Sequence, residues 1–490
     1  MRIPGAHMRH TAELGDWVVF AHVGGMIVIT SWSFGGQTLW MRELATFWSL
    51  AGGIGIAIRA MTARSRDPAR TLRRWLALLW PLLAFVAFAG ASILNPLYAP
   101  MQIGGQEVLV EQKPLAWLPA SASPAETLRD LALFTGIVLS CFNLYWAVND
   151  RRTLRRLCLL IAVNTVALAV LGTVQKLLGA TLMIGGVLPP NLKFFSTFIY
   201  HNHWGAFTLV VLCMCLALLF HSSRHRHGSL WNSPGTAGLV ATLFLAASLP
   251  ISQSRSSTAL AVLVAGAACT HAAWLAIRRR TALKSLAIPA AIALTLLGVA
   301  TAGIAVLARP MFEERIAQTR QQVADMREGN WVAVDDRPAV YRDTLRMIAD
   351  RPMTGWGLES YGHVFPLYKG GDIVGPRYVH AHSDWLQTVA ECGILGTLLI
   401  ILFAARFLWR LPLAGPGLPG FPAWLLAGCA TVVVYAALEF PFANPAVQMV
   451  FWTAFFGAVR YVRLIEKQTS RESILSDSRQ APHFRIKDST

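Results

Sequence analysis

The sequence predicts an all-α polytopic membrane protein with about twelve transmembrane helices. Of its 490 residues, 54% are hydrophobic and only 14% are charged, whereas about 25% of the residues of a soluble protein are charged. Apolar stretches of about 20 residues, the length that crosses about 30 Å of hydrocarbon, recur along the chain. Most Lys and Arg residues lie in short clusters between these stretches, as they do in the cytoplasmic loops of membrane proteins.

Each apolar stretch is expected to form one spanning helix. The first begins near Trp17, lacks a small-residue cleavage site and is followed by further apolar stretches, so we expect a spanning helix there and not a cleavable signal. The expected helices are residues 17–34, 43–60, 75–94, 128–148, 157–177, 203–221, 236–252, 257–277, 286–308, 384–405, 422–440 and 446–464.

The basic clusters predict the orientation of these helices. If the N-terminus is cytoplasmic, the loops on the cytoplasmic side contain Arg59–Arg74, Arg151–Arg156, Arg224 with Arg226, Arg278–Arg280, and Arg406 with Arg410. The positive-inside rule therefore predicts that both termini are cytoplasmic. The net charge of +17 is explained by this pattern, which argues against nucleic-acid binding.

The remaining segments define the expected organisation of the chain. We expect the first nine helices within residues 1–308, a long and partly helical periplasmic loop at 309–383, the last three helices within 384–466, and a polar, disordered cytoplasmic tail at 467–490. The seven cysteines lie in or beside apolar stretches without metal-ligand spacing, so they are expected to be small buried hydrophobes.

The long loop carries helical patterns of its own. Met311–Arg327 is charged and amphipathic, and Val340–Asp350 places apolar residues at helical spacing. Arg351-Pro352 is expected to stop the second of these helices, and Gly355-Trp-Gly357 to form a tight turn. A loop of this length with its own periodicity is usually functional.

His380 and His382 lie where this loop meets the apolar segment 384–405. Titratable groups are costly inside a bilayer but not at its edge, where water remains on one side. There His382 could take a proton from a sugar hydroxyl, as a general base does near neutral pH. The alternative is an interfacial histidine that only hydrogen-bonds the loop. Gly393 and Gly396 follow, and their spacing is expected to allow close contact with a neighbouring helix.

Arg255, within Ser252-Gln-Ser-Arg-Ser256, is a cation between two long apolar segments on the same predicted face as His382. A guanidinium close to hydrocarbon is costly unless it is paired, and arginine binds phosphate oxygens bidentately. We therefore favour an anion-binding role over the alternative, a side chain that extends to the interface.

A second histidine pair, His201-Asn-His203, lies at another outer edge, with Lys193 upstream. Two histidine pairs could in principle bind zinc, but no ligand spacing supports a metal site. Polarity of the loop or hydrogen bonding to a substrate is the preferred interpretation of Lys193 and His203.

Three arginines of the long loop, Arg342, Arg346 and Arg351, could line a pocket for an anionic donor. Solvated or salt-bridged arginines are an equal alternative, because acidic residues lie close in the sequence. These are Asp343, Asp350 and Glu359.

The motif around His382 resembles that of the O-antigen ligase family. His382-Ser383 is followed by the nine residues 384–392 and then by Gly393-x-x-Gly396. Tyr341-Arg342, the stretch from Asp350 to Gly357, and Ser254-Arg255-Ser256 between two helices also resemble that family.

The resemblance implies a membrane-embedded, metal-independent glycosyltransferase without a cofactor. Its donor would be a glycan on undecaprenyl pyrophosphate, used at the periplasmic face of the bacterial inner membrane. His382 would be the base that activates the acceptor hydroxyl, and Arg255 would hold the pyrophosphate, since fixed cations can stabilise a leaving group. His380 would support His382. One departure stands out: family members often have a second arginine near Lys193–His203, where this chain offers only Lys193 and histidines.

Several functions remain open within and outside this resemblance. The acceptor would be lipid A–core in a ligase, or a second glycan in a polymerase of O-antigen or exopolysaccharide repeat units. A twelve-helix transporter is less favoured, because transporters place ionisable residues and broken helices at the midplane and show two related halves. A catalytically inactive scaffold for an envelope-polysaccharide complex is the third alternative.

Overall fold

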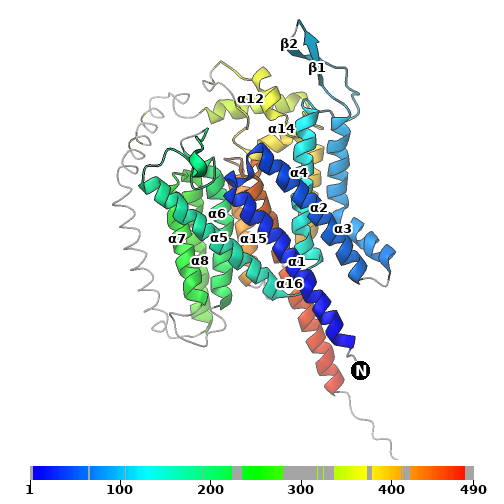
Figure 1. Ribbon diagram of the computed structural model, residues 1–490, viewed down its shortest axis with the longest axis vertical. Coiled ribbons are helices and arrows are strands. Elements are labelled where there is room, and N and C mark those ends of the chain that lie inside the picture. Colours follow the sequence, from blue (N-terminus) through cyan, green and yellow to red (C-terminus); the bar gives the residue numbers. More distant parts are fainter. Residues whose placement is uncertain are drawn as a thin grey trace, which may run out of the picture.

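The computed structural model describes residues 4–64, 67–104, 106–190, 193–222, 234–279, 317, 320, 324, 336–371, 373, 378–409, 411 and 420–480. Long helices run side by side in a bundle (Figure 1). They are α1 (Pro4–Trp32), α2 (Leu39–Arg64), α3 (Pro68–Ile93), α4 (Pro124–Trp146), α5 (Arg151–Leu177), α6 (His201–Ser222), α7 (Pro234–Ile251), α8 (Arg255–Arg279), α14 (Asp384–Leu408), α15 (Gly420–Tyr435) and α16 (Pro445–Gln480).

The apolar stretches form the helices that the sequence predicts. Eight helices of the described chain are long and apolar enough to cross a membrane, and Gly238–Ile251 and Gly420–Tyr435 are shorter apolar helices. Every expected segment except 286–308, which lies outside the described residues, coincides with a helix. The prediction of a mostly helical, multi-pass membrane protein is confirmed, whereas the number of spans and their orientation stay predictions.

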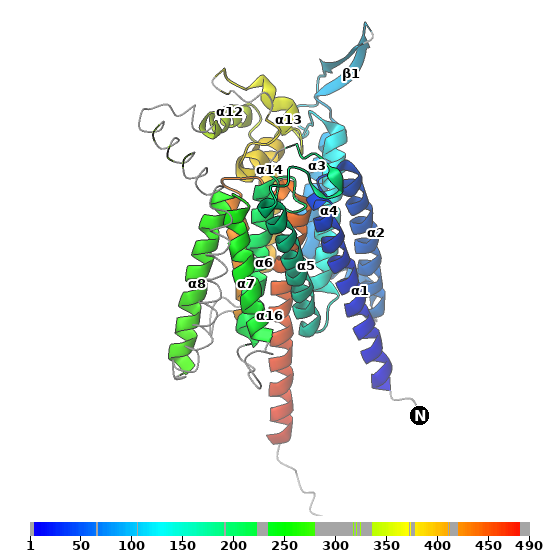
Figure 2. The ribbon, with the colours of Figure 1, turned by 60° about the vertical axis from the view of Figure 1, so that its left-hand side comes forward.

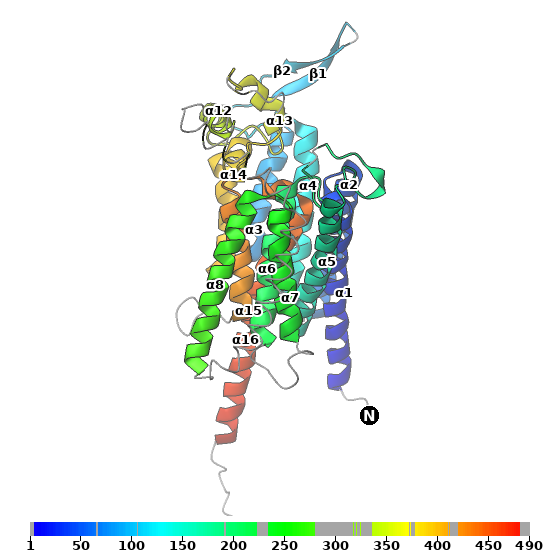
Figure 3. The same ribbon diagram turned by 90° about the vertical axis from the view of Figure 1, so that its left-hand side faces the viewer.

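The shorter elements gather at one end of the bundle, the end at which α14 begins (Figures 2 and 3). We call this end the loop end, and the end at which α1 begins the terminal end. The shorter elements are α12 (Arg337–Asp350), α13 (Tyr361–Val364), η1 (Phe34–Gly36), η2 (Ile184–Gly186), η4 (Phe365–Leu367), η5 (Pro441–Ala443), β1 (Tyr98–Ile103) and β2 (Gln106–Glu111). The predicted helix Val340–Asp350 is confirmed as part of α12, while Met311–Arg327 lies almost wholly outside the described residues.

The chain is mostly helical, as predicted, but two parts of it differ from the sequence predictions. One is an antiparallel hairpin in which Tyr98 pairs with Glu111 and Ile103 with Gln106. Alternating apolar residues and the turn at Gly104, whose φ is +60°, explain it. The tail is also helical as far as Gln480, because α16 continues beyond the apolar part with an i,i+4 bond from Gln468 to Glu472.

Two apolar cores hold these parts together. The bundle core surrounds α6, which is buried along nearly its whole length against α5, α7, α15 and α16. A second, smaller core lies at the loop end and includes Val340, Met347, Tyr361, Phe365 and Ala390. Because Ala390 belongs to α14, this core packs the loop onto the start of that helix. Six cysteines are buried as expected, but Cys269 of α8 is exposed.

Candidate functional site

His382 lies immediately before α14, at the loop end. Ser383 caps that helix, and its hydroxyl accepts a hydrogen bond from the Leu386 amide. The backbone of His382 has φ +53°, a left-handed conformation that is uncommon for a residue with a side chain and recurs at functional sites. Tyr341 of α12 donates to the His382 carbonyl at 2.9 Å. The position of the imidazole is therefore fixed by both α12 and α14.

The imidazole faces a buried carboxylate that sequence reasoning missed. Glu439, between α15 and η5, is 2% exposed, and its Oε2 lies 3.8 Å from Nδ1 of His382. Oε1 accepts from Asn202 Nδ2 at 2.7 Å and from Arg337 Nη2 at 2.5 Å, and Oε2 accepts from Tyr200 at 3.2 Å. The sequence placed Glu439 near the end of an apolar helix. An acidic residue in such a segment was the signal, because ionisable groups there are usually functional.

The surroundings of Glu439 determine its charge. Burial raises the pKa of the carboxyl, but His382 and Arg337 outweigh burial and hold its pKa below the usual value. Glu439 is therefore ionised at neutral pH. Burial, followed by the charge of Glu439, raises the pKa of the Tyr200 hydroxyl, which remains a neutral donor.

The ring of Phe440 brings both histidine motifs together. Tyr200 and His380 stack on it, with centroids 5.2 and 4.4 Å away. His203 and His382 meet it edge-on at 5.1 and 5.0 Å, and Nε2 of His203 lies 3.2 Å from the Phe440 carbonyl oxygen. Burial lowers the pKa of His380 to about 4, so this histidine is neutral at neutral pH. His203, 179 positions before His382 in the sequence, thus belongs to the same cluster.

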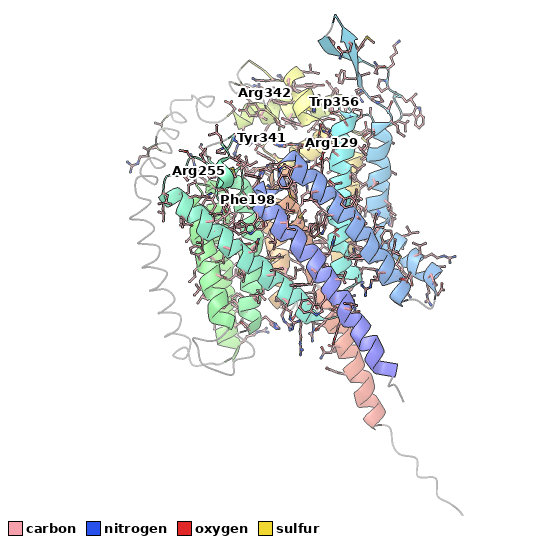
Figure 4. The ribbon with its side chains drawn as sticks, viewed as in Figure 1. Arg129, Phe198, Arg255, Tyr341, Arg342 and Trp356 are labelled. Carbon is pink, nitrogen blue, oxygen red and sulfur yellow. The ribbon has the colours of Figure 1, made fainter. Side chains whose placement is uncertain are left out.

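Arg255 is the first residue of α8, and its side chain is exposed. The preceding Ser254 lies 3.3 Å from the hydroxyl of Tyr435, which donates to the Asn202 carbonyl at 3.2 Å. The segment before Arg255 is thereby linked to the residue that holds Glu439. Figure 4 shows Arg255 at the loop end, as it does Tyr341 and Arg342. Lys193 is also exposed, and its carbonyl accepts from the His201 amide.

The loop arginines contact protein groups. Arg342 and Arg346 both donate to Asp343, which is fully buried, at 3.0 and 3.3 Å. Arg351 lies over the Trp356 ring, 4.9 Å from its centroid. Arg342 remains 47% exposed, so it can still reach a ligand, but these contacts agree with the salt-bridged alternative that the sequence left open.

Gly393 has a role other than the one predicted. It has φ +63° and ψ −176°, which interrupts α14. The backbone of Pro352–Gly357 fills the interruption: Ile394 N donates to Pro352 O, and Trp356 N donates to Ala390 O. The expectation that Gly393 allows close contact with a neighbouring helix is therefore wrong, because a loop occupies this position. Gly396 does allow such a contact, since a Cβ there would lie 3.0 Å from Phe88 of α3.

Within the described residues, no group of three or more His, Cys, Asp or Glu side chains is arranged to hold a metal ion.

Comparison with known proteins gives a family match over part of the chain. No curated protein matches the chain. Residues 240–401 match the family model described as O-antigen ligase. The matched range contains Arg255, α12, His382 and both glycines, while Asn202 and Glu439 lie outside it. The match supports an O-antigen ligase-like family for this chain.

Proposed function

We propose that the protein transfers a glycan from undecaprenyl pyrophosphate to an acceptor hydroxyl at the periplasmic face of the inner membrane. The family match supports glycan transfer of the O-antigen ligase type. The observation that carries the proposal is the place of His382, at the junction of loop and helix bundle and 3.8 Å from an ionised, buried carboxylate. A donor that is half lipid and half sugar reacts at such a junction.

In the proposed reaction, His382 removes the proton of the acceptor hydroxyl. The acceptor oxygen forms a bond to the anomeric carbon of the donor sugar, and the bond from that carbon to the pyrophosphate oxygen breaks. The lipid pyrophosphate leaves with the electron pair, and Arg255 stabilises its charge through its exposed guanidinium. His380, His203, Lys193 and Arg342 are the further substrate-binding candidates at the loop end.

The distribution of charge supports a periplasmic site. Helices α3 and α5 begin at the terminal end of the bundle, away from α12 (Figure 1), and they carry Arg70–Arg74 and Arg151–Arg156 near their first residues. By the positive-inside rule this end is cytoplasmic. The loop end, with His382, then faces the periplasm.

A transporter is the second candidate, because α14 is interrupted and transporters bind substrates at interrupted helices. In a transporter the exposed backbone groups of the interruption contact the substrate. Here Pro352–Gly357 occupies them: Gly357 N donates to Glu391 O, and Leu395 N donates to Met353 O. The backbone groups of the interruption are thus already bonded to the loop and are not exposed to a substrate. This favours glycan transfer over transport.

The acceptor is proposed to be lipid A–core, as in a ligase, and the alternative is a growing glycan, as in a polymerase. Purified protein is supplied with a lipid-linked repeat unit, with and without lipid A–core. A single transfer that requires core supports the ligase, whereas a ladder without core supports the polymerase. Full transfer by both His382→Ala and Arg255→Ala variants, with normal membrane insertion, would refute the proposed function.

A further inference from the structure

We propose that Glu439 is a positioning residue, which holds His382 in the tautomer that accepts the acceptor's proton and stabilises the cation that then forms. This inference rests on the proposed function. It concerns a residue outside both the matched family range and the motif around His382.

The first support is the direction in which the imidazole points. Nδ1 of His382 is buried and makes no hydrogen bond among the described residues, and it faces Oε2 of Glu439 at 3.8 Å. The side chain is 25% exposed. Because Nδ1 is buried against Glu439, we assign the substrate hydroxyl to the other ring nitrogen, Nε2. A distance of 3.8 Å allows an ion pair, and catalytic hydrogen bonds often shorten when the substrate binds.

The second support is the rigidity of the carboxylate. Three donors other than His382 hold its two oxygens: Asn202 and Tyr200 from the start of α6, and Arg337 from the start of α12. The backbone is held as well, because Asp384 N donates to Glu439 O at 3.1 Å. With both ends fixed, Glu439 cannot turn away from Nδ1.

The chemistry follows from this geometry. An ionised carboxylate facing Nδ1 favours the tautomer with the proton on Nδ1, which leaves the lone pair of Nε2 for the acceptor proton. When Nε2 takes that proton, the imidazolium gains its charge 3.8 Å from the negative charge of Glu439. The proton leaves Nε2 for water after the lipid pyrophosphate departs, and Glu439 keeps its charge throughout.

Other titratable groups near the pair could also contribute to the pH dependence. They are Arg337 on α12, Tyr200 and His203 at the start of α6, Tyr378 and His380 in the loop, and Asp384 at the start of α14. Arg337 already contacts Oε1, so replacing Glu439 also removes the negative charge that offsets Arg337 beside His382. This change disfavours protonation of the imidazole.

The test measures the pH–rate profile of glycan transfer by purified Glu439→Gln, with Glu439→Asp and the exposed Glu43→Gln as comparison variants. We expect Glu439→Gln to lower kcat by about 100-fold or more, with little change in the KM for the donor. The acidic limb of its pH–rate profile should move to lower pH, because the negative charge of Glu439 that favours protonation of His382 is gone. Glu439→Asp should recover part of the rate, and Glu43→Gln should match the unmodified protein.

A purely structural role for Glu439 predicts a different result. Reduced activity that parallels loss of folded protein, with the acidic limb unmoved, would overturn the inference. If Glu439→Gln does not fold, Tyr200→Phe is the second variant to test. It removes one donor to the Glu439 carboxylate and keeps the ring that stacks on Phe440. A smaller fall in kcat with unchanged KM is then expected, and an unchanged kcat would count against the inference.

Failure of the inference and failure of the proposed function can be told apart. If His382→Ala is inactive while Glu439→Gln keeps full activity, the function stands and the inference is wrong. If His382→Ala keeps its activity, both are wrong. In the variant with both changes, transfer should equal that of His382→Ala, because Glu439 acts only through His382.

Discussion

Gly393 of α14 lies so close to Met353 that a Cβ on residue 393 would be 2.3 Å from the Met353 carbonyl oxygen. Gly355 meets α14 in the same way, since its Cβ would be 2.3 Å from the Glu391 carbonyl oxygen. The two glycines allow two backbones to interlock. This contact joins the loop that carries α12 to the helix that begins beside His382.

Gly393→Ala should therefore separate the loop from α14. The new Cβ would clash with the Met353 carbonyl oxygen. In addition, the backbone conformation of residue 393 costs about 1–3 kcal/mol in a residue other than glycine. We expect a lower melting temperature in detergent and a large loss of transfer activity. Gly90→Ala in α3 is the control, because nothing lies within 4 Å of its Cβ. Equal stability of the two variants would contradict the interlocked arrangement.

Arg255→Ala should weaken binding of the donor's pyrophosphate and also slow transfer. Charge that develops on the leaving pyrophosphate makes the loss greater in the transition state than in the ground state, so kcat should fall more than KM rises. Arg255→Lys should recover only part of the rate, because an ammonium does not bind phosphate bidentately. The measurement is steady-state transfer at varied donor concentration. A change in KM alone would show that Arg255 binds without stabilising the leaving group.

The free energy of unfolding should decrease as the pH falls, because His380 is kept neutral in the folded protein. Burial lowers its pKa to about 4 from 6.5, so the unfolded chain takes up the proton first as the pH falls. The stability due to neutral His380 is complete above pH 6.5 and is lost as the pH falls from 6.5 towards 4. His380→Asn should therefore lose less stability than the unmodified protein over this interval. Melting temperatures in detergent at several pH values measure it, and parallel curves would contradict the prediction.

Asp343→Asn should loosen the loop without touching the bundle. Asp343 is fully buried and accepts bonds from Arg342, Arg346 and the Gly370 amide. Both arginine side chains are substantially exposed, 47% and 63%, so losing their ion pairs with Asp343 costs about 0–1 kcal/mol each, and the bond from the Gly370 amide is weakened as well. Limited proteolysis should cut the loop faster in this variant. Exposed Glu111→Gln on β2 is the control and should be cut at the unmodified rate.

The sequence predicted those parts of the fold that depend on apolar length. Helices such as α5 and α14 were placed within a few residues, because a spanning segment must be long and apolar whatever surrounds it. The β1–β2 hairpin was missed because the segment between the expected helices 75–94 and 128–148 was treated as a loop. The interruption at Gly393 was missed for another reason: it depends on a loop some forty residues earlier in sequence returning to α14.

The sequence predicted only those residues of the site that belong to local motifs. His382, His203 and the segment before Arg255 are polar residues at the edges of apolar stretches, and the sequence marks such edges clearly. Glu439 was missed because it was counted within the expected helix 422–440, although its partners Asn202 and Arg337 come from α6 and α12. Sequence patterns do not show pairings across such distances.

The most direct measurement is glycan transfer by purified His382→Ala in proteoliposomes that contain the lipid-linked donor and lipid A–core. Matched amounts of the unmodified protein and of the exposed-residue variant Glu43→Gln provide the comparison. If His382 is the base, its loss should lower the rate by about 10²–10⁴-fold without reducing the amount of inserted, folded protein. Transfer at the unmodified rate by His382→Ala would contradict the central claim.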